Sequence, residues 1–501
     1  MEQEKKRIRL TTDAQKNAIL FAGIIIVYCF WLVRAYGYMS SRSGDANSIW
    51  NCIATWDTAE TQYSYVLYKG IFALYPYLWF YRLETLLGLP GQSLCIVFFA
   101  ILYAYSAVYG FPAVAKYLAG QDKPVSTWKR LLFAAVLFAI AEYSFIYSEL
   151  MVDLPSMAFY LMMIHLAILL PKQDKKMSFR AQKYVHFLAL GLCTGVCFGF
   201  SGQYSLATGC IVIFVLEKIS KEFQTTQRNE SLQVWLRISA YASGILFIVW
   251  LNQRFLNNVV GSAVENGAFI PTGEWWMERS LYRSLQYYQY WIQYIPAPRT
   301  MQIANRLYGE TEALKRFMDI DNNMEYAFWS TFTYLKTAFR YLVDFLTVWL
   351  NHFFKAISMD QYHQCVSSLS VCYIALYTSL YTLVKRVKRW GDIFNKNTWI
   401  VLGFLCTAIP LMVMTIEPRC AVIMVGFFLS FMICGNELWD GIAEAMKWFK
   451  KAINEKRSGA FREARFPKAF AAGVIFFIMC FAWYAALMEN CGTGTDILFH
   501  L

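Results

Sequence analysis

The sequence lacks the residue spacings that mark a structural metal site. Its 13 cysteines include no CxxC pair, and most of them lie inside apolar runs, where a thiol behaves as a small hydrophobe. Its five histidines are scattered along the chain, at positions 165, 186, 352, 363 and 500. We therefore expect no structural metal centre.

The sequence also lacks an internal repeat and any low-complexity segment, and we expect no cleavable leader. Residues 1–17 are polar and basic, and the long apolar run that follows has no small-residue cleavage pattern before Arg34. We expect this first run to be a signal anchor. No ten-residue alternation of polar and apolar residues occurs, which favours membrane helices over the strands of a barrel.

Apolar residues dominate what is present. Hydrophobic residues make up 57% of the chain, aromatic residues 18%, and the mean hydropathy is +0.35, which is typical of an integral membrane protein. Since about 20 apolar residues cross a bilayer as a helix, we predict an all-α polytopic protein with about 11 to 13 transmembrane helices. The eleven clearest apolar runs lie at 18–38, 92–115, 131–149, 154–171, 184–200, 203–217, 237–252, 367–384, 398–415, 420–438 and 469–488.

Three segments interrupt this series. The loop 39–91 is too long for a linker, and its aromatic second part is typical of a membrane interface. The region 253–366 is a second long insertion, whose later part carries either interfacial helices or one or two extra spans. The basic segment 439–468 has apolar residues spaced as in an amphipathic surface helix. We accordingly divide the chain into an N-terminal membrane module at 1–252, the region 253–366, and a C-terminal set of helices at 367–501.

The basic residues predict the orientation of the chain. With the N-terminus in the cytoplasm, the predicted inner segments hold 30 of the 46 lysines and arginines, as the positive-inside rule requires. The loops 39–91 and 253–366 then face outward from the cell (cytoplasmic) membrane. The net charge of +12 follows from this topology and suits an anionic inner leaflet, so no nucleic-acid partner is needed.

Ionisable residues at the edge of a membrane are costly and mark functional sites. The loop 39–91 places Asp45, Asp57 and Glu60 among aromatic residues that include Trp50 and Trp56. By the predicted topology, further ionisable residues lie at the same outer face, namely Lys69, Glu149, Asp153, Glu417 and Arg419. We expect these residues to share a cleft.

Four patches of sequence support a family resemblance. Asp45 follows the first apolar run closely, and an aromatic segment with Pro76 occupies 73–81. An acidic turn at 147–155 opens the fourth run, and Ile416-Glu417-Pro418-Arg419 opens a late one. In this order, the patches resemble the GT-C superfamily of polytopic glycosyltransferases, which includes protein O-mannosyltransferases and lipid A aminoarabinose transferases.

The chain departs from the family pattern at two positions. Ala46 stands where the family has the second acid of an Asp-Glu pair, and Cys420 stands where it has a tyrosine. The first departure leaves two alternatives for the base, Asp45 or Asp57 with Glu60. Spacing favours Asp45, whereas the i, i+3 pairing favours Asp57.

The resemblance implies a GT-C-like fold and a glycan-building activity in the cell envelope. The donor would be a polyprenyl-phosphate-linked sugar, the acceptor a glycan, lipid or protein, and membrane lipid a further partner. The acids Asp45, Asp57, Glu60 and Asp153 would be catalytic, with Glu149 and Glu417 in support. Arg419 would bind the donor phosphate with Lys69 and Arg299, while Trp50, Trp56 and Tyr75 would stack on sugars. A divalent cation at the acidic pair is also compatible with the sequence.

Structural roles compete with these assignments. Asp57 and Asp153 each fit the N-cap of a helix, Lys69 fits an interfacial helix whose lysine reaches the headgroups, and Glu417 with Arg419 fits a local ion pair. Two other classes of function also remain open. One is a membrane transporter or a flippase of lipid-linked glycans, and the other is a membrane-bound O-acyltransferase with His165 as the catalytic residue.

Overall fold

The computed structural model describes most of the chain. The described residues are 2–37, 39, 44–56, 71–142, 150, 152–170, 180–200, 204–225, 231–265, parts of 332–357, 366–385, 397–409, 421–458, 471–480 and 482.

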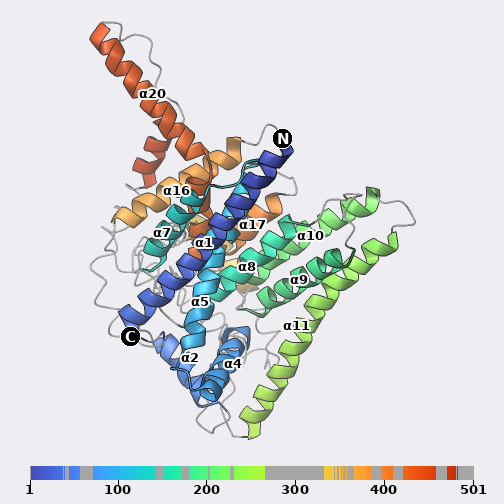
Figure 1. Cartoon of the computed structure of the whole chain (residues 1–501). Coiled ribbons are helices and arrows are strands. Elements are labelled where there is room, and N and C mark those ends of the chain that lie inside the picture. Colours follow the sequence, from blue (N-terminus) through green and yellow to red (C-terminus); the bar gives the residue numbers. More distant parts are fainter. Residues whose placement is uncertain are drawn as a thin grey trace.

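Every element within these ranges is a helix, which confirms the predicted all-α class. Each of the eleven apolar runs contains a described helix (Figure 1). The elements are α1 (Glu2–Tyr36), α2 (Gly44–Ala54), α4 (Ile71–Leu87), α5 (Ser93–Tyr105), η1 (Ser106–Gly110), α6 (Phe111–Leu118), α7 (Thr127–Glu142), α8 (Asp153–Ile168), α9 (Arg180–Gly199), α10 (Ser205–Thr225), α11 (Ser231–Glu265), α16 (Val366–Lys385), α17 (Thr398–Cys406), α19 (Val422–Cys434) and α20 (Glu437–Ser458).

The chain is a membrane protein by the length and composition of its helices. Among the described residues, three helical segments are long and apolar enough to cross a bilayer, at Asp13–Ala35, Ser93–Leu118 and Leu232–Phe255. The bent pair Val422–Cys434 and Glu437–Lys451 raises this number to four if it counts as one span. Several other apolar helices are shorter, so the expected number of 11 to 13 spans stays a prediction.

Two hydrogen bonds between distant parts of the chain identify the two ends of the bundle. At the end where α1 finishes, the Met39 carbonyl accepts a hydrogen bond from Leu150 N, just before α8, over 3.0 Å. At the opposite end, Thr127 at the start of α7 donates to Asn17 of α1 over 3.1 Å. We call these the Met39 end and the Lys129 end, the latter after the lysine of α7 that donates to Gly435 and Asn436 just after α19. Since α7 starts at the Lys129 end and α8 starts at the Met39 end, these two helices run in opposite directions.

Glycines bring α9 and α11 into close contact. Gly191 and Gly195 lie four residues apart on α9, the spacing that lets membrane helices approach closely. A β-carbon at Gly195 would lie 2.7 Å from the Ile248 β-carbon, and one at Gly244 would lie 2.7 Å from the Leu188 carbonyl oxygen. The two helices therefore form a tight pair at one side of the bundle (Figure 1).

The centre of the bundle is aromatic. Phe404 of α17 stacks on Phe427 of α19 with ring centroids 4.1 Å apart. Ser379 of α16 donates to the Phe428 carbonyl of α19 over 3.1 Å, which ties a third helix to this pair. Every residue of α19 is buried, so this helix is the core of the C-terminal half.

The second apolar run is interrupted by a π-helical turn. Phe111 N donates to the Ser106 carbonyl across η1, five residues back rather than four. The turn leaves the Val108 carbonyl available to a side chain, and Arg130 of α7 donates its Nη1 hydrogen to it. Arg130 thereby joins α7 to the middle of this long helix.

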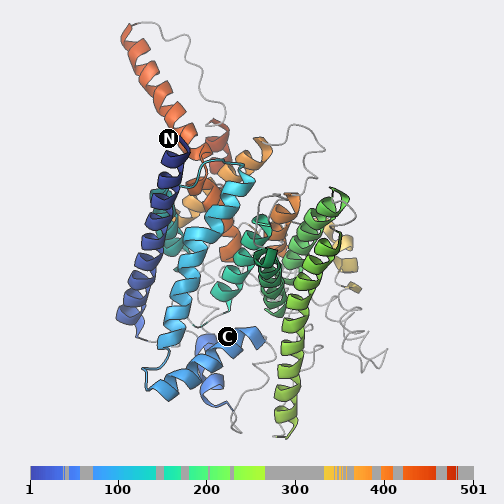
Figure 2. The same ribbon diagram turned by 45° about the vertical axis from the view of Figure 1, so that its right-hand side comes forward.

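The two long segments predicted between the apolar runs, 39–91 and 253–366, both contain residues that pack on the bundle. The loop 39–91 contains α2 and α4 at the Met39 end, so it holds short helices against the bundle (Figure 2). The predicted boundary at 252 falls inside α11, whose 35 residues span about 52 Å. Within 332–357, Ala338, Phe345 and Ile357 are buried in the main core, so part of the region 253–366 packs on the bundle.

Candidate functional site

The site begins with two short helices that lie across the Met39 end. On α2, the residues Ala46, Ile49 and Ile53 are buried at helical spacing and fix one face of the helix against the bundle. On α4, Leu74 and Tyr77 are buried in the same way. The opposite faces of both helices are therefore directed away from the core.

A buried polar network holds the ends of three helices together. Met39 N donates to Gln92 Oε1 over 2.6 Å. The Glu84 carboxylate, only 2% exposed, accepts hydrogen bonds from Gln92 N over 2.8 Å and from Leu94 N over 2.6 Å. These two N–H groups lie at the start of α5, where a helix has unsatisfied donors and a positive dipole end. Glu84 thus anchors α4 to α5, and Gln92 anchors α5 to the end of α1.

Asp153 lies beside this network, at the first residue of α8. Asp153 is only 7% exposed, and it lies close enough to Tyr77 of α4 for its negative charge to disfavour ionisation of the tyrosine. Burial raises the pKa of Tyr77 well above its ordinary value, and Cys95 and Asp153 raise it further. The alternative role of Asp153 as an N-cap is wrong, because Val152 occupies that position and Asp153 is the first helical residue.

Aromatic rings connect α4 and the residues just after α2 to Phe255 in the later part of α11. Trp56 stacks on Phe255 at 5.7 Å between centroids and an interplanar angle of 16°, and Tyr75 meets the same ring edge-on at 4.6 Å. Trp79 lies 6.1 Å from Tyr75 and is 54% exposed. Trp50 packs edge-on against Tyr81 at 5.6 Å. The three aromatic residues predicted to bind sugar therefore all lie at the Met39 end, partly buried.

Arg254 is a basic residue at this site that the sequence analysis missed. It is exposed on α11 next to Phe255, and its guanidinium lies 5.6 Å from the centre of the Trp250 ring. Arginine beside an aromatic ring is common where a membrane helix meets water, and a guanidinium can bind phosphate through two oxygens. The signal was present in the sequence, as the first arginine after the apolar run 237–252.

The other predicted site residues are described in part or not at all. Asp45 is the second residue of α2, next to the buried Ala46, and only its backbone is described. The remaining acids and bases of the prediction lie outside the described residues, namely Asp57, Glu60, Lys69, Glu149, Arg299, Glu417 and Arg419. The structure therefore brings together α2 with Asp45, the aromatic residues and Asp153.

Histidines near the Lys129 end make packing contacts. The His165 ring nitrogen Nδ1 lies 3.0 Å from the Tyr105 hydroxyl, and His186 Nε2 lies 2.8 Å from the Leu166 carbonyl. Both histidines thus have hydrogen-bond partners between neighbouring helices.

Within the ranges that the structure describes, no group of three or more His, Cys, Asp or Glu side chains comes together.

Comparisons with protein families, with curated proteins and with solved structures find no match to this chain.

Proposed function

We propose that the chain is a membrane glycosyltransferase of GT-C type. It would transfer a hexosyl or pentosyl group from a polyprenyl-phosphate-linked donor to a glycan, lipid or protein acceptor. The observation that carries the proposal is the pair of hydrogen bonds at Met39, whose N–H donates to Gln92 Oε1 and whose carbonyl accepts from Leu150 N. These bonds bring α2, with Asp45, and the start of α8, with Asp153, to one end of the bundle. The family resemblance assigns acids to these same two segments.

The reaction needs a base near the acceptor. The acceptor hydroxyl oxygen forms a bond with the anomeric carbon of the sugar, and the bond between that carbon and the phosphate oxygen breaks. The hydroxyl proton passes to a carboxylate, and polyprenyl phosphate leaves with the electron pair of the broken bond. Asp45, Asp57 with Glu60, and Asp153 are the candidates for this base. The burial of Asp153 beside Tyr77 suits a carboxylate that works away from bulk water.

The leaving phosphate needs a cation, because its negative charge grows in the transition state. Arg254 is the described residue that suits this role, since it is exposed beside the aromatic residues of the Met39 end. Arg419, Lys69 and Arg299 are the other candidates, from the sequence. The flat faces of Trp50, Trp56, Tyr75 and Trp79 suit the apolar faces of sugar rings.

The proposal places the Met39 end at the outer face of the cell membrane. The count of lysines and arginines supports this orientation, because the basic loops join helices at the Lys129 end. The exposed apolar residues of α11, such as Leu246 and Trp250, suit contact with lipid and with a polyprenyl chain.

The test is sugar transfer by the purified full chain in lipid nanodiscs, with a panel of polyprenyl-phosphate-linked sugars as donors. We expect Asp45→Asn, Asp57→Asn or Asp153→Asn to lower the transfer rate by about a hundredfold or more. Arg254→Gln should raise the KM for the donor. Asp122→Asn is the matched control, because Asp122 is an exposed acid between α6 and α7. Full transfer by all three acid variants, at wild-type thermal stability, would refute the proposal.

A further inference from the structure

Helix α20 leaves the bundle with an uncovered apolar stripe. It is bent by 46° from α19 at a short break, and both views show it projecting beyond the other helices at the Lys129 end (Figures 1 and 2). Ile442, Met446, Phe449 and Ile453 follow one another at intervals of four, three and four residues, so they share one face. They are 39%, 67%, 51% and 55% exposed, so this face is open along the helix.

Charge is sorted along the same helix. Its first part carries three acids, Glu437, Asp440 and Glu444, and no base. From residue 445 onward it has five basic residues and one acid, the bases being Lys447, Lys450, Lys451, Lys456 and Arg457. Lys447, Lys450 and Lys451 are exposed. The part of α20 that is farther from α19 is therefore strongly basic.

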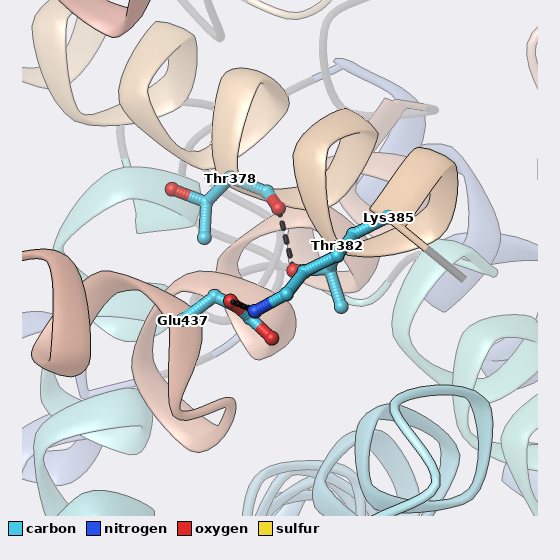
Figure 3. A network of polar contacts seen from close by, with 4 residues as sticks. All are labelled: Thr378, Thr382, Lys385 and Glu437. Atoms are coloured by element: carbon cyan, nitrogen blue, oxygen red, sulfur yellow. Dashed lines mark hydrogen bonds and ion pairs between the residues drawn. The ribbon is translucent and has the colours of Figure 1, made fainter. Parts of the chain in front are cut away.

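The acidic beginning of α20 is held by lysines of the bundle. Lys385, the last residue of α16, forms an ion pair with Glu437 over 2.7 Å, next to the hydrogen bond between Thr382 and Thr378 (Figure 3). Lys129 of α7 donates to the Gly435 carbonyl over 2.8 Å and to Asn436 Oδ1 over 3.0 Å. The beginning of α20 and the break before it are thus fixed to two helices, α16 and α7.

Tryptophans complete this attachment. Trp439 donates its indole N–H to the Ile433 carbonyl over 2.9 Å and packs edge-on against Trp128 at 5.1 Å between centroids. Tryptophan is enriched where a membrane meets water. Because α19 is wholly buried and apolar, α20 begins where the apolar part of the bundle ends.

We propose that α20 is an arm that binds the surface of an anionic lipid leaflet. The stripe of Ile442, Met446, Phe449 and Ile453 enters the boundary between headgroups and acyl chains, and the lysines beside it contact lipid phosphates. Charge complementarity favours lipid as the occupant, because the apolar stripe and the basic charges occur together on the part of the helix that extends from the bundle. The orientation with most basic residues in the cytoplasm makes this leaflet the inner one, which is rich in anionic lipid.

The lysines set the strength of this binding. A basic residue at an anionic surface contributes about a fivefold factor to the equilibrium between the bound and unbound arm. Replacing Lys447, Lys450 and Lys451 by glutamine should therefore shift that equilibrium by about a hundredfold toward the unbound arm. Replacing the same three by arginine keeps the charge and should keep the arm bound.

The experiment uses the full chain in nanodiscs of phosphatidylcholine, with or without phosphatidylglycerol. An environment-sensitive fluorescent amino acid replaces Met446 in the stripe or, as the control, Glu444 on the opposite face. At 446, we expect a blue shift with phosphatidylglycerol and quenching by brominated lipid. At 444, we expect neither. The three-glutamine variant should lose the effect of phosphatidylglycerol at 446, and the three-arginine variant should retain it.

Two results would overturn the proposal. One is a probe at 446 that brominated lipid does not quench in nanodiscs with phosphatidylglycerol. The other is a blue shift that appears in detergent and grows with protein concentration, because a second copy of the chain would then cover the stripe. Neither result depends on sugar transfer, so this proposal and the proposed enzyme activity can fail separately.

Discussion

The Met39 amide donates a hydrogen bond to the Gln92 side chain over 2.6 Å, between residues that are 53 positions apart in the sequence. Gln92 holds a left-handed backbone conformation, with φ of 69°, and its own N–H donates to Glu84. One buried glutamine therefore links the end of α1 to the beginning of α5 and, through Glu84, to α4. The candidate site depends on this link for its shape.

Removing the Glu84 carboxylate should destabilise the Met39 end. Glu84→Ala leaves the N–H groups of Gln92 and Leu94 buried without their acceptor, at a cost of about 1–3 kcal/mol. Thermal unfolding of the detergent-solubilised protein, followed by tryptophan fluorescence, would measure this loss. Glu217→Ala is the control, because Glu217 forms an i, i+4 pair with Lys221, whose side chain is 61% exposed, and such pairs contribute little. Equal stability of the two variants would show that the network is unimportant.

Two glycines should respond in opposite directions to alanine. A β-carbon at Gly244 would lie 2.7 Å from the Leu188 carbonyl oxygen and from Leu192 N, so Gly244→Ala should force α9 and α11 apart and cost about 1–3 kcal/mol. A β-carbon at Gly209 of α10 meets nothing within 4 Å. Gly209→Ala should therefore stabilise the helix by about 0.5–1 kcal/mol. Unfolding temperatures of the two variants compare the effects directly, and a stabilising Gly244→Ala would contradict the close packing of α9 on α11.

Cys210 and Cys406 should form a disulfide under a mild copper-based oxidant. Their sulfur atoms lie 3.8 Å apart, between α10 and α17. The oxidant would accept the two electrons released as two thiols become one disulfide and two protons. Mass spectrometry of protease digests would identify the linked peptides, and Cys406→Ser should abolish the link. If no link forms in the native protein, these two helices do not pack as described.

The ion pair between Lys385 and Glu437 should make the attachment of α20 sensitive to alkali. The hydrogen bond with Glu437 raises the pKa of Lys385 above its ordinary value. A raised lysine pKa stabilises the pair fully below about pH 10.4, the pKa of an unfolded lysine, and this stabilisation is lost as the pH rises through the folded pKa. Hydrogen exchange at the beginning of α20 should therefore accelerate in alkali relative to the intrinsic rate. Lys385→Met should raise the exchange near neutral pH and remove that extra acceleration, and an unchanged profile would contradict the prediction.

The apolar runs of the sequence predicted the helices well, because burial in a bilayer requires long apolar segments whatever their partners. Helix α20 was predicted from a different local property, the helical spacing of its apolar residues from Ile442 to Ile453. The number of spans stays a prediction, because helices such as α17 and α19 are short and α19 is wholly buried in the bundle. Length alone does not identify such helices as spans.

The site was less predictable from the sequence. Its aromatic residues were found from composition, but Glu84 and Gln92 were missed because their partners are distant in the sequence. An N-cap was the structural alternative to the catalytic role predicted for Asp153, because Asp before Leu-Pro is a common helix start, whereas the helix begins at Asp153 itself. The glycosyltransferase resemblance stays a prediction that transfer assays must test.

The π-helical turn at Ser106–Gly110 fixes the rotational register of α6. One extra residue in this turn rotates everything after it by about 100° relative to a continuous α-helix. That rotation places Phe111 against Gly426 of α19, where a β-carbon on the glycine would lie 2.8 Å from a carbon of the phenyl ring. Deleting one residue within the turn should therefore leave a continuous α-helix with Phe111 still facing α19, whereas inserting one more residue would turn Phe111 away from α19.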